Sequence, residues 1–144
     1  FATWSEGNRP NINGEEVSWL KSAQPDNSRE SFEKYLRIVY AYASTLSLEK
    51  EMTPVEPEEL AVGDVFIKGG SPGHVVIVVD MAVNRETGEK RFILLQGNMP
   101  SQQAHIIKNT FEPQISPWFS DSFPQKKLVL ATWECPLANI KRFA

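Results

Sequence analysis

The chain has 144 residues, of which 41% are hydrophobic and 23% charged, a composition typical of a globular domain. Its net charge is −3 without a basic cluster, so nucleic-acid binding is disfavoured. Apolar runs of about five residues are too short to span a membrane, and one cysteine excludes an internal disulfide framework. We therefore predict a single domain over residues 1–144, with no nucleic-acid partner and no membrane span.

The first part of the chain predicts a β-hairpin followed by the main helix. Asn13-Gly14 is the signature of a two-residue turn between strands at residues 9–12 and 15–20. Asn27, with Glu30 three residues later, is typical of a capping box at the start of a helix over residues 28–46. The apolar stripe of this helix, expected to pack against a sheet that contains Val76 and Val78, includes Phe32, Leu36, Val39 and Ala43.

The rest of the chain predicts short strands close together. They are expected at residues 64–68, 75–83, 90–96, 104–108 and 127–134, which favours an antiparallel meander. Residues 109–125 are predicted to form a long loop, and residues 137–143 a closing helical turn. The predicted fold class is therefore α+β: a small curled antiparallel sheet (a partly open barrel) with one main helix and an N-terminal hairpin.

Residues 63–80 carry the main chemical signal. Gly69-Gly70-Ser71-Pro72-Gly73 permits a sharp turn. The run from Val75 to Val79 is β-branched throughout, as is typical of a strand buried on both faces. His74 lies between them, where a general base could be held, although a histidine at a strand start is also often an ordinary rim residue.

The next strand supplies candidate partners for His74. Gly88 stands where a bulged hairpin loop needs left-handed backbone. If that loop has three or five residues, paired positions sum to an even number, and His74 shares a face with Gln96 and Asn98. We predict a distance within about 3.5 Å, or one bridging water, between a ring nitrogen and a carboxamide that fixes its tautomer.

These residues resemble a known enzyme fold. Gly63-Asp64 opening a strand, Gly73-His74 opening the next and a polar pair closing the third are similar to the papain-like amidase barrel of NlpC-type endopeptidases and CHAP domains. CHAP domains have an acidic residue and an asparagine in that pair, whereas this chain has Gln96 and Asn98. Residues 63–108 and Ser116-Pro117-Trp118 resemble more closely an uncharacterised family of exported bacterial proteins, a domain of unknown function, and this similarity extends over most of the chain.

The resemblance implies an exported, cell-envelope cysteine amidase or peptidase that acts on amide bonds of peptides or peptidoglycan. His74 would be the base, Gln96 and Asn98 its orienting residues, and Gly73 and Trp118 would contact the substrate. Trp118 is interpreted either as a platform for a sugar or peptide or as a plug for the open end of the barrel. The alternative function is a non-catalytic binding module that uses the same groove.

The nucleophile is the missing part of this hypothesis. In such amidases a thiol precedes the Gly-Asp strand at a helix N-terminus, which lowers its pKa, but no cysteine precedes Asp64. Three explanations stay open: a cysteine helix removed before Phe1, a non-catalytic descendant, or Cys135 acting in a permuted order. Cys135 is not expected to be the nucleophile, because the neighbouring carboxylate of Glu134 would raise its pKa. The 144-residue chain is therefore expected to lack amidase activity.

No metal or cofactor is predicted. The two histidines, His74 and His105, belong to no ligand-spaced cluster. The acidic stretch at residues 49–59 is interpreted as a solvated connection. Gly69-Gly70 leads into a strand rather than a helix, so a phosphate-binding loop is not indicated.

Overall fold

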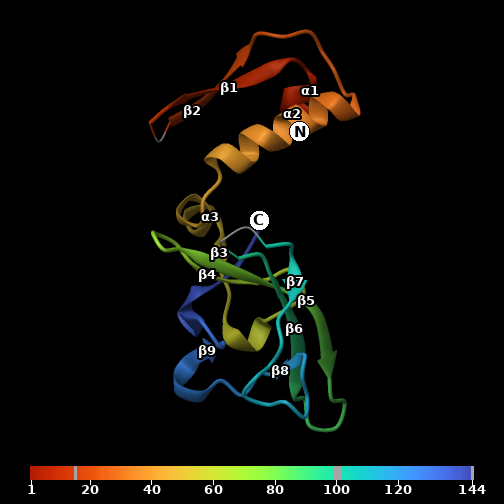
Figure 1. Ribbon diagram of the computed structural model, residues 1–144, viewed down its shortest axis with the longest axis vertical. Coiled ribbons are helices and arrows are strands. Elements are labelled where there is room, and N and C mark those ends of the chain that lie inside the picture. Colours follow the sequence, from red (N-terminus) through yellow and green to blue (C-terminus); the bar gives the residue numbers. More distant parts are fainter. Residues whose placement is uncertain (15, 99–101, 144) are drawn as a thin grey trace. The chain divides into compact units, whose positions relative to one another are not determined.

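The computed structural model describes residues 1–14, 16–98 and 102–143. The chain forms two compact units, residues 1–43 and 44–144, and most of their helices and strands are labelled in Figure 1. Helices and antiparallel strand pairs occur together, which confirms the α+β class. The single domain over residues 1–144 stays a prediction, and each unit is taken by itself below.

The first unit contains the predicted hairpin. Its elements are α1 (Ala2–Ser5), β1 (Asn8–Asn13), β2 (Glu16–Lys21) and α2 (Arg29–Tyr42). Strands β1 and β2 pair antiparallel, and Gly14 in the turn has φ +62°, a left-handed conformation that glycine adopts without steric cost. Glu15, expected in the second strand, lies outside the described residues.

The predicted helix over residues 28–46 is two helices. Ser28, not Asn27, is the N-cap of α2, and its side chain accepts a hydrogen bond from the Ser31 backbone N–H. The helix ends because Ala43 takes an extended conformation with ψ 130°. Ser44 then starts α3 (Thr45–Glu51) through a capping box with Ser47, a local signal strong enough to begin a new helix.

The apolar stripe of α2 is less buried than the periodicity predicted. Within the first unit, Phe32 contacts the Phe1 ring edge-on at 5.1 Å but is still 40% exposed. The cluster around Val76 and Val78 is formed by residues of the second unit. The packing of the α2 stripe against that sheet therefore stays a prediction.

The second unit is built around an open sheet. Its strands follow the order β3 (Thr53–Pro54), β11 (Ile140–Arg142), β4 (Val65–Lys68), β5 (His74–Val83), β6 (Lys90–Gln96) and β7 (His105–Ile106), and β8 (Trp118–Ser120) also pairs with β6. Figure 1 shows β5 and β6 side by side as the longest pair. Within the described residues β3 and β7 end the sheet without pairing to each other, so the predicted partly open barrel is instead an open sheet.

The last third of the chain differs from the predicted strands. The expected strand at residues 127–134 is a hairpin of β9 (Lys127–Val129) and β10 (Glu134–Pro136), because the chain reverses where the Leu130 N–H donates to the Trp133 carbonyl. The expected closing helical turn is a short 3₁₀ turn, η3 (Leu137–Asn139), followed by β11. Two further 3₁₀ turns are η1 (Pro57–Glu59) and η2 (Pro124–Lys126).

Strand β4 is buried on both faces, whereas the β-branched run of β5, predicted to be buried on both, is buried on one face only, and its Val79 is 36% exposed. On one face the fully buried Phe66 and Val78 belong to a cluster with Leu128 and Cys135 of the β9–β10 hairpin. On the other face, Met52 at the end of α3 joins the cluster of Val65 and Ile67. Within the second unit, α3 therefore covers this face of the sheet.

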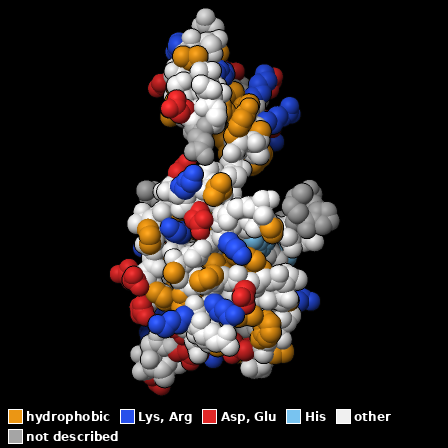
Figure 2. Space-filling model, turned by 90° about the vertical axis from the view of Figure 1, so that its left-hand side faces the viewer, with side chains coloured by type: hydrophobic (Ala, Val, Ile, Leu, Met, Phe, Trp, Pro, Cys, Tyr) orange, Lys and Arg blue, Asp and Glu red, His pale blue; other side chains and the backbone are white. Residues whose placement is uncertain are grey.

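Charges are mixed over the surface of the second unit. On the face drawn in Figure 2, basic and acidic side chains are interspersed rather than gathered by sign. No helix within the described ranges is long and apolar enough to cross a membrane.

Candidate functional site

His74 begins β5 directly after the glycine-rich turn, and its backbone pairs with Lys68 of β4. Alternation along the strand places it on the face of Val76 and Val78, the face of the larger cluster. The Trp133 ring, which packs against that cluster, contacts the imidazole edge-on with centroids 4.9 Å apart. His74 is only partly buried, and histidine side chains reach the surface in Figure 2. A packed sheet therefore holds an imidazole that solvent can still reach.

The register that brings His74 to its partner comes from a β-bulge. Near the loop, paired positions sum to an odd number, as at Val83↔Lys90. A shift between Val78 and Asp80 makes the sum even at Ile77↔Leu95. The predicted face sharing is thus present, but the extra residue in β5 produces it rather than the loop length.

Gln96 makes the predicted contact with His74. Gln96 Oε1 lies 2.8 Å from His74 Nε2, within hydrogen-bond distance. On its other side, Gln96 Nε2 lies 3.4 Å from Nε2 of His105. The His74–carboxamide contact is confirmed, and its catalytic role stays a prediction.

His105 is the residue that the sequence analysis missed at this site. It was considered only as a metal ligand, yet it lies directly across from Gln96 in the β6–β7 pair. Its Nδ1 is 2.9 Å from the Gln103 carbonyl oxygen. The predicted strand at residues 104–108 contains His105, but a strand of two residues carries no pattern that gives its register against β6.

Asn98 and Gly73 are two further residues predicted at this site. Asn98 lies just after β6, where its carbonyl accepts a hydrogen bond from the Gln102 N–H at 3.0 Å. The space beside the Gly73 Cα is filled: an added Cβ would lie 2.0 Å from Thr45 Oγ1 and 2.7 Å from the Gly70 carbonyl oxygen. This glycine permits close packing of the turn on α3, a structural reason for its presence.

Trp118 does not join His74. Its neighbour Phe119 pairs with Phe92 and stacks on it in the core, with ring centroids 6.0 Å apart. Strand alternation therefore turns Trp118 to the opposite face of the sheet from His74. Its predicted substrate contact stays a prediction, but at a place separate from the imidazole.

Cys135 is a core residue. Its side chain is fully buried in the larger cluster, and its Sγ lies 3.7 Å from the Ile67 carbonyl oxygen. Burial, with a smaller contribution from the charge of Glu49, raises the pKa of the Cys135 thiol to about 12. The prediction that the pKa of Cys135 is raised is right, but the neighbouring Glu134 is not the cause. The carboxylate of Glu134 is instead paired with Lys127 Nζ at 2.7 Å.

Glu49 is not simply solvated, as the acidic stretch had suggested. One carboxylate oxygen accepts the Gly69 N–H at 3.1 Å, and the other accepts the Asn139 amide at 3.1 Å. It therefore ties α3 to the turn before His74 and to η3. In the described part of the chain, no group of three or more His, Cys, Asp or Glu side chains is arranged to hold a metal ion.

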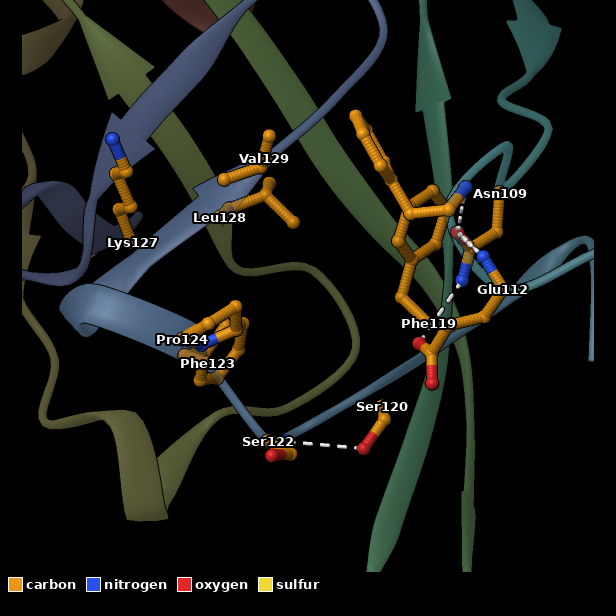
Figure 3. A pocket seen from close by; sticks show the side chains of 11 residues that line it. Asn109, Glu112, Phe119, Ser120, Ser122, Phe123, Pro124, Lys127, Leu128 and Val129 are labelled. Carbon is orange, nitrogen blue, oxygen red and sulfur yellow. Dashed lines mark hydrogen bonds between the residues drawn. The ribbon is translucent and has the colours of Figure 1, made fainter.

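A separate pocket of about 390 Å³ lies away from these residues. Figure 3 shows Asn109 and Phe119 on one side of it and Leu128 and Val129 on the other. Neither His74 nor Gln96 lines it. Its volume is in the range of small-molecule sites, but its lining lacks the histidines, so the pocket and the imidazole are distinct features.

Comparisons with known proteins support one part of the expected resemblance, the similarity to a domain of unknown function. The family model described as domain of unknown function 4846 matches residues 1–142. No curated protein and no solved structure matches the chain, and nothing in these comparisons supports the NlpC-type or CHAP resemblance. The chain belongs to the family of domain of unknown function 4846.

Proposed function

We propose that residues 44–144 carry an amidase- or peptidase-like site in which His74 is the base. The observation that carries the proposal is the 2.8 Å contact between His74 Nε2 and Gln96 Oε1. A carbonyl oxygen only accepts, so Nε2 carries the proton and Nδ1 carries the lone pair. Cysteine and serine hydrolases use such a histidine, oriented by a second polar group, to take a proton from a nucleophile.

The substrate class in this proposal is an amide bond in a peptide or a peptidoglycan-like polymer, and the location is the bacterial cell envelope after export. Both come from the resemblance to papain-like amidases. An imidazole beside a carboxamide at a sheet surface suits such a ligand, because both can hydrogen-bond to amide groups.

A second candidate function is a binding module without chemistry. The observation that favours it is the burial of Cys135, whose raised pKa removes the thiolate that a cysteine hydrolase needs. A general base contributes typically about 10²–10⁴-fold, but only when a nucleophile is positioned to give up its proton. For the 144-residue chain we therefore expect binding of peptidoglycan stem peptides without their cleavage.

The two functions separate in one experiment. The chain is incubated with purified stem peptides, cleavage is followed by mass spectrometry, and binding is followed by NMR titration. The variants are His74→Ala and, as a control in the core, Cys135→Ala. Binding that His74→Ala weakens, without cleavage, supports the binding module. Cleavage that His74→Ala abolishes and Cys135→Ala retains supports the amidase with another nucleophile. A chain that neither binds nor cleaves would contradict both functions.

A further inference from the structure

Two histidines of the chain are joined through one glutamine. Gln96 lies between them, with Oε1 2.8 Å from His74 Nε2 and Nε2 3.4 Å from His105 Nε2. The far ring nitrogen of His105, Nδ1, is 2.9 Å from the Gln103 carbonyl oxygen. The chain of contacts thus begins at a backbone carbonyl and ends at the His74 ring.

The backbone carbonyl of Gln103 determines which group donates and which accepts at every contact between it and His74. The Gln103 carbonyl can only accept, so Nδ1 of His105 carries a proton. In a neutral imidazole the other nitrogen, Nε2, is then an acceptor, and it needs a donor from Gln96. The NH₂ group of Gln96 must therefore face His105, which leaves Oε1 to accept the Nε2 proton of His74.

This assignment does not depend on which way the Gln96 amide was placed. The O and N ends of an amide are assigned from the hydrogen bonds that they make. Turning the amide over would direct its carbonyl at the bare Nε2 of His105, where two acceptors would meet. The reversed arrangement therefore costs a hydrogen bond at His105.

We propose that His105 is a positioning residue for His74: by fixing the orientation of the Gln96 amide, it holds the His74 proton on Nε2 and the lone pair on Nδ1. The inference deepens the proposed function, because a base needs its lone pair on the nitrogen that meets the proton. His105 acts only through Gln96, and it is opposite Gln96 because β7 pairs with the end of β6.

The two-histidine composition allows a direct test by NMR. Histidine is labelled with ¹⁵N in the full chain, and long-range ¹H–¹⁵N spectra are recorded at pH about 9, where an ordinary imidazole is neutral. Protonated and bare ring nitrogens have different ¹⁵N shifts, so each ring reports its own tautomer. In the wild-type chain we expect His74 to carry its proton on Nε2 and His105 to carry its proton on Nδ1.

Two variants separate positioning from simple structural support. His105→Phe keeps a ring but removes the acceptor, so the two ¹⁵N shifts of His74 should move toward the average of both tautomers. His105→Glu presents only acceptor oxygens at this pH and should restore the single-tautomer pattern. Backbone amide shifts of Val76 and Leu94 report that the sheet is intact in each variant.

The proposal is overturned if wild-type His74 carries its proton on Nδ1, or if His105→Phe leaves both His74 shifts unchanged. Should His105→Phe fail to fold, the wild-type tautomers and His105→Glu decide the question alone. The spectra are independent of any substrate. A confirmed tautomer without cleavage or binding of stem peptides would therefore remove the proposed function and leave the role of His105 standing.

Discussion

Among single residues, Cys135 gives the sharpest chemical expectation. Its fully buried thiol has a pKa raised to about 12, so almost no thiolate exists in the folded chain at pH 8. We expect a thiol-alkylating probe to label Cys135 far more slowly in the native protein than in urea. Labelling of the native protein at the rate of a free cysteine would contradict this and would restore Cys135 as a candidate nucleophile.

The same pKa predicts how stability depends on pH. The folded thiol holds its proton up to about pH 12, whereas the unfolded thiol releases it near pH 9.0, the ordinary pKa of a cysteine. Between these values the folded state binds more protons, so the free energy of unfolding falls as pH rises, by at most about 1.4 kcal/mol per pH unit. Urea unfolding of the wild type and of Cys135→Ala between pH 8.5 and about 10.5 measures it. Parallel pH profiles for the two proteins would show that the thiol does not contribute to the pH dependence of the free energy of unfolding.

Arg142 is the counterion of a buried carboxylate. Asp64 is 1% exposed, and Arg142 donates to its two oxygens at 2.6 and 2.9 Å. The hydrogen bond and the charge of Asp64 raise the pKa of the guanidinium. Arg142→Gln should destabilise the second unit, because it leaves a buried charge without its ion pair. Urea midpoints for Arg142→Gln, Asp64→Asn and the double variant test this. If Arg142→Gln is as costly in the Asp64→Asn background, the pair is not the cause.

Part of the candidate site could be predicted from the sequence, and the rest could not. Period-2 alternation correctly put His74 and Gln96 on one face, because strand side chains alternate. The assumed loop length was wrong, and the bulge between Val78 and Asp80 compensated for it. A strand was predicted at residues 104–108, but no local pattern specifies its register against β6, so His105 was not placed beside Gln96.

Among the elements, the turn between β4 and β5 depends on close packing against α3. A Cβ at Gly73 would approach Thr45 Oγ1 to 2.0 Å and the Gly70 carbonyl oxygen to 2.7 Å. We expect Gly73→Ala to lower the free energy of unfolding by about 1–3 kcal/mol, the usual cost of overpacking. Gly97→Ala is the matched control, because the nearest atom to its Cβ, the Gln102 carbonyl oxygen, is 3.8 Å away. Equal midpoints for the two variants in urea would show that the turn can move away from α3.

Elements were predictable where hydrophobic pattern and local signals agree. The β-branched run after His74 and the Asn13-Gly14 turn both gave the observed strands. Strand β8 follows Pro117 in a proline-containing segment, and only its pairing with β6 makes it a strand. The helical period continued past Ala43, but the Ser44–Ser47 capping box divided the helix. Hydrophobic periodicity carries no information on strand pairing between distant segments or on a second helix cap within a helical pattern.

For the whole molecule, the distribution of buried residues predicts where mutations are costly. Leu94 is fully buried in the cluster of the second unit, whereas Leu36 of α2 is only partly buried and belongs to neither cluster. Leu94→Ala should lower the free energy of unfolding by about 2–5 kcal/mol, and Leu36→Ala should lower it clearly less. Hydrogen exchange resolves the effect by unit: amides of β4 and β6 should lose protection in Leu94→Ala, while those of α2 keep theirs. A uniform loss over both units would favour one cooperative domain over residues 1–144.

The short outer strands of the seven-stranded sheet limit how another chain can attach to it. Strands β3 and β7 have two residues each and β8 has three, and Pro54 of β3 lacks a backbone N–H. Strand addition by a peptide gains affinity from a row of main-chain hydrogen bonds along a free edge, and edges this short provide few of them. The outer strands β3, β7 and β8 are thereby protected against edge-to-edge aggregation. At these outer strands, a peptide ligand of the proposed kind would be recognised by side chains rather than by becoming an additional strand.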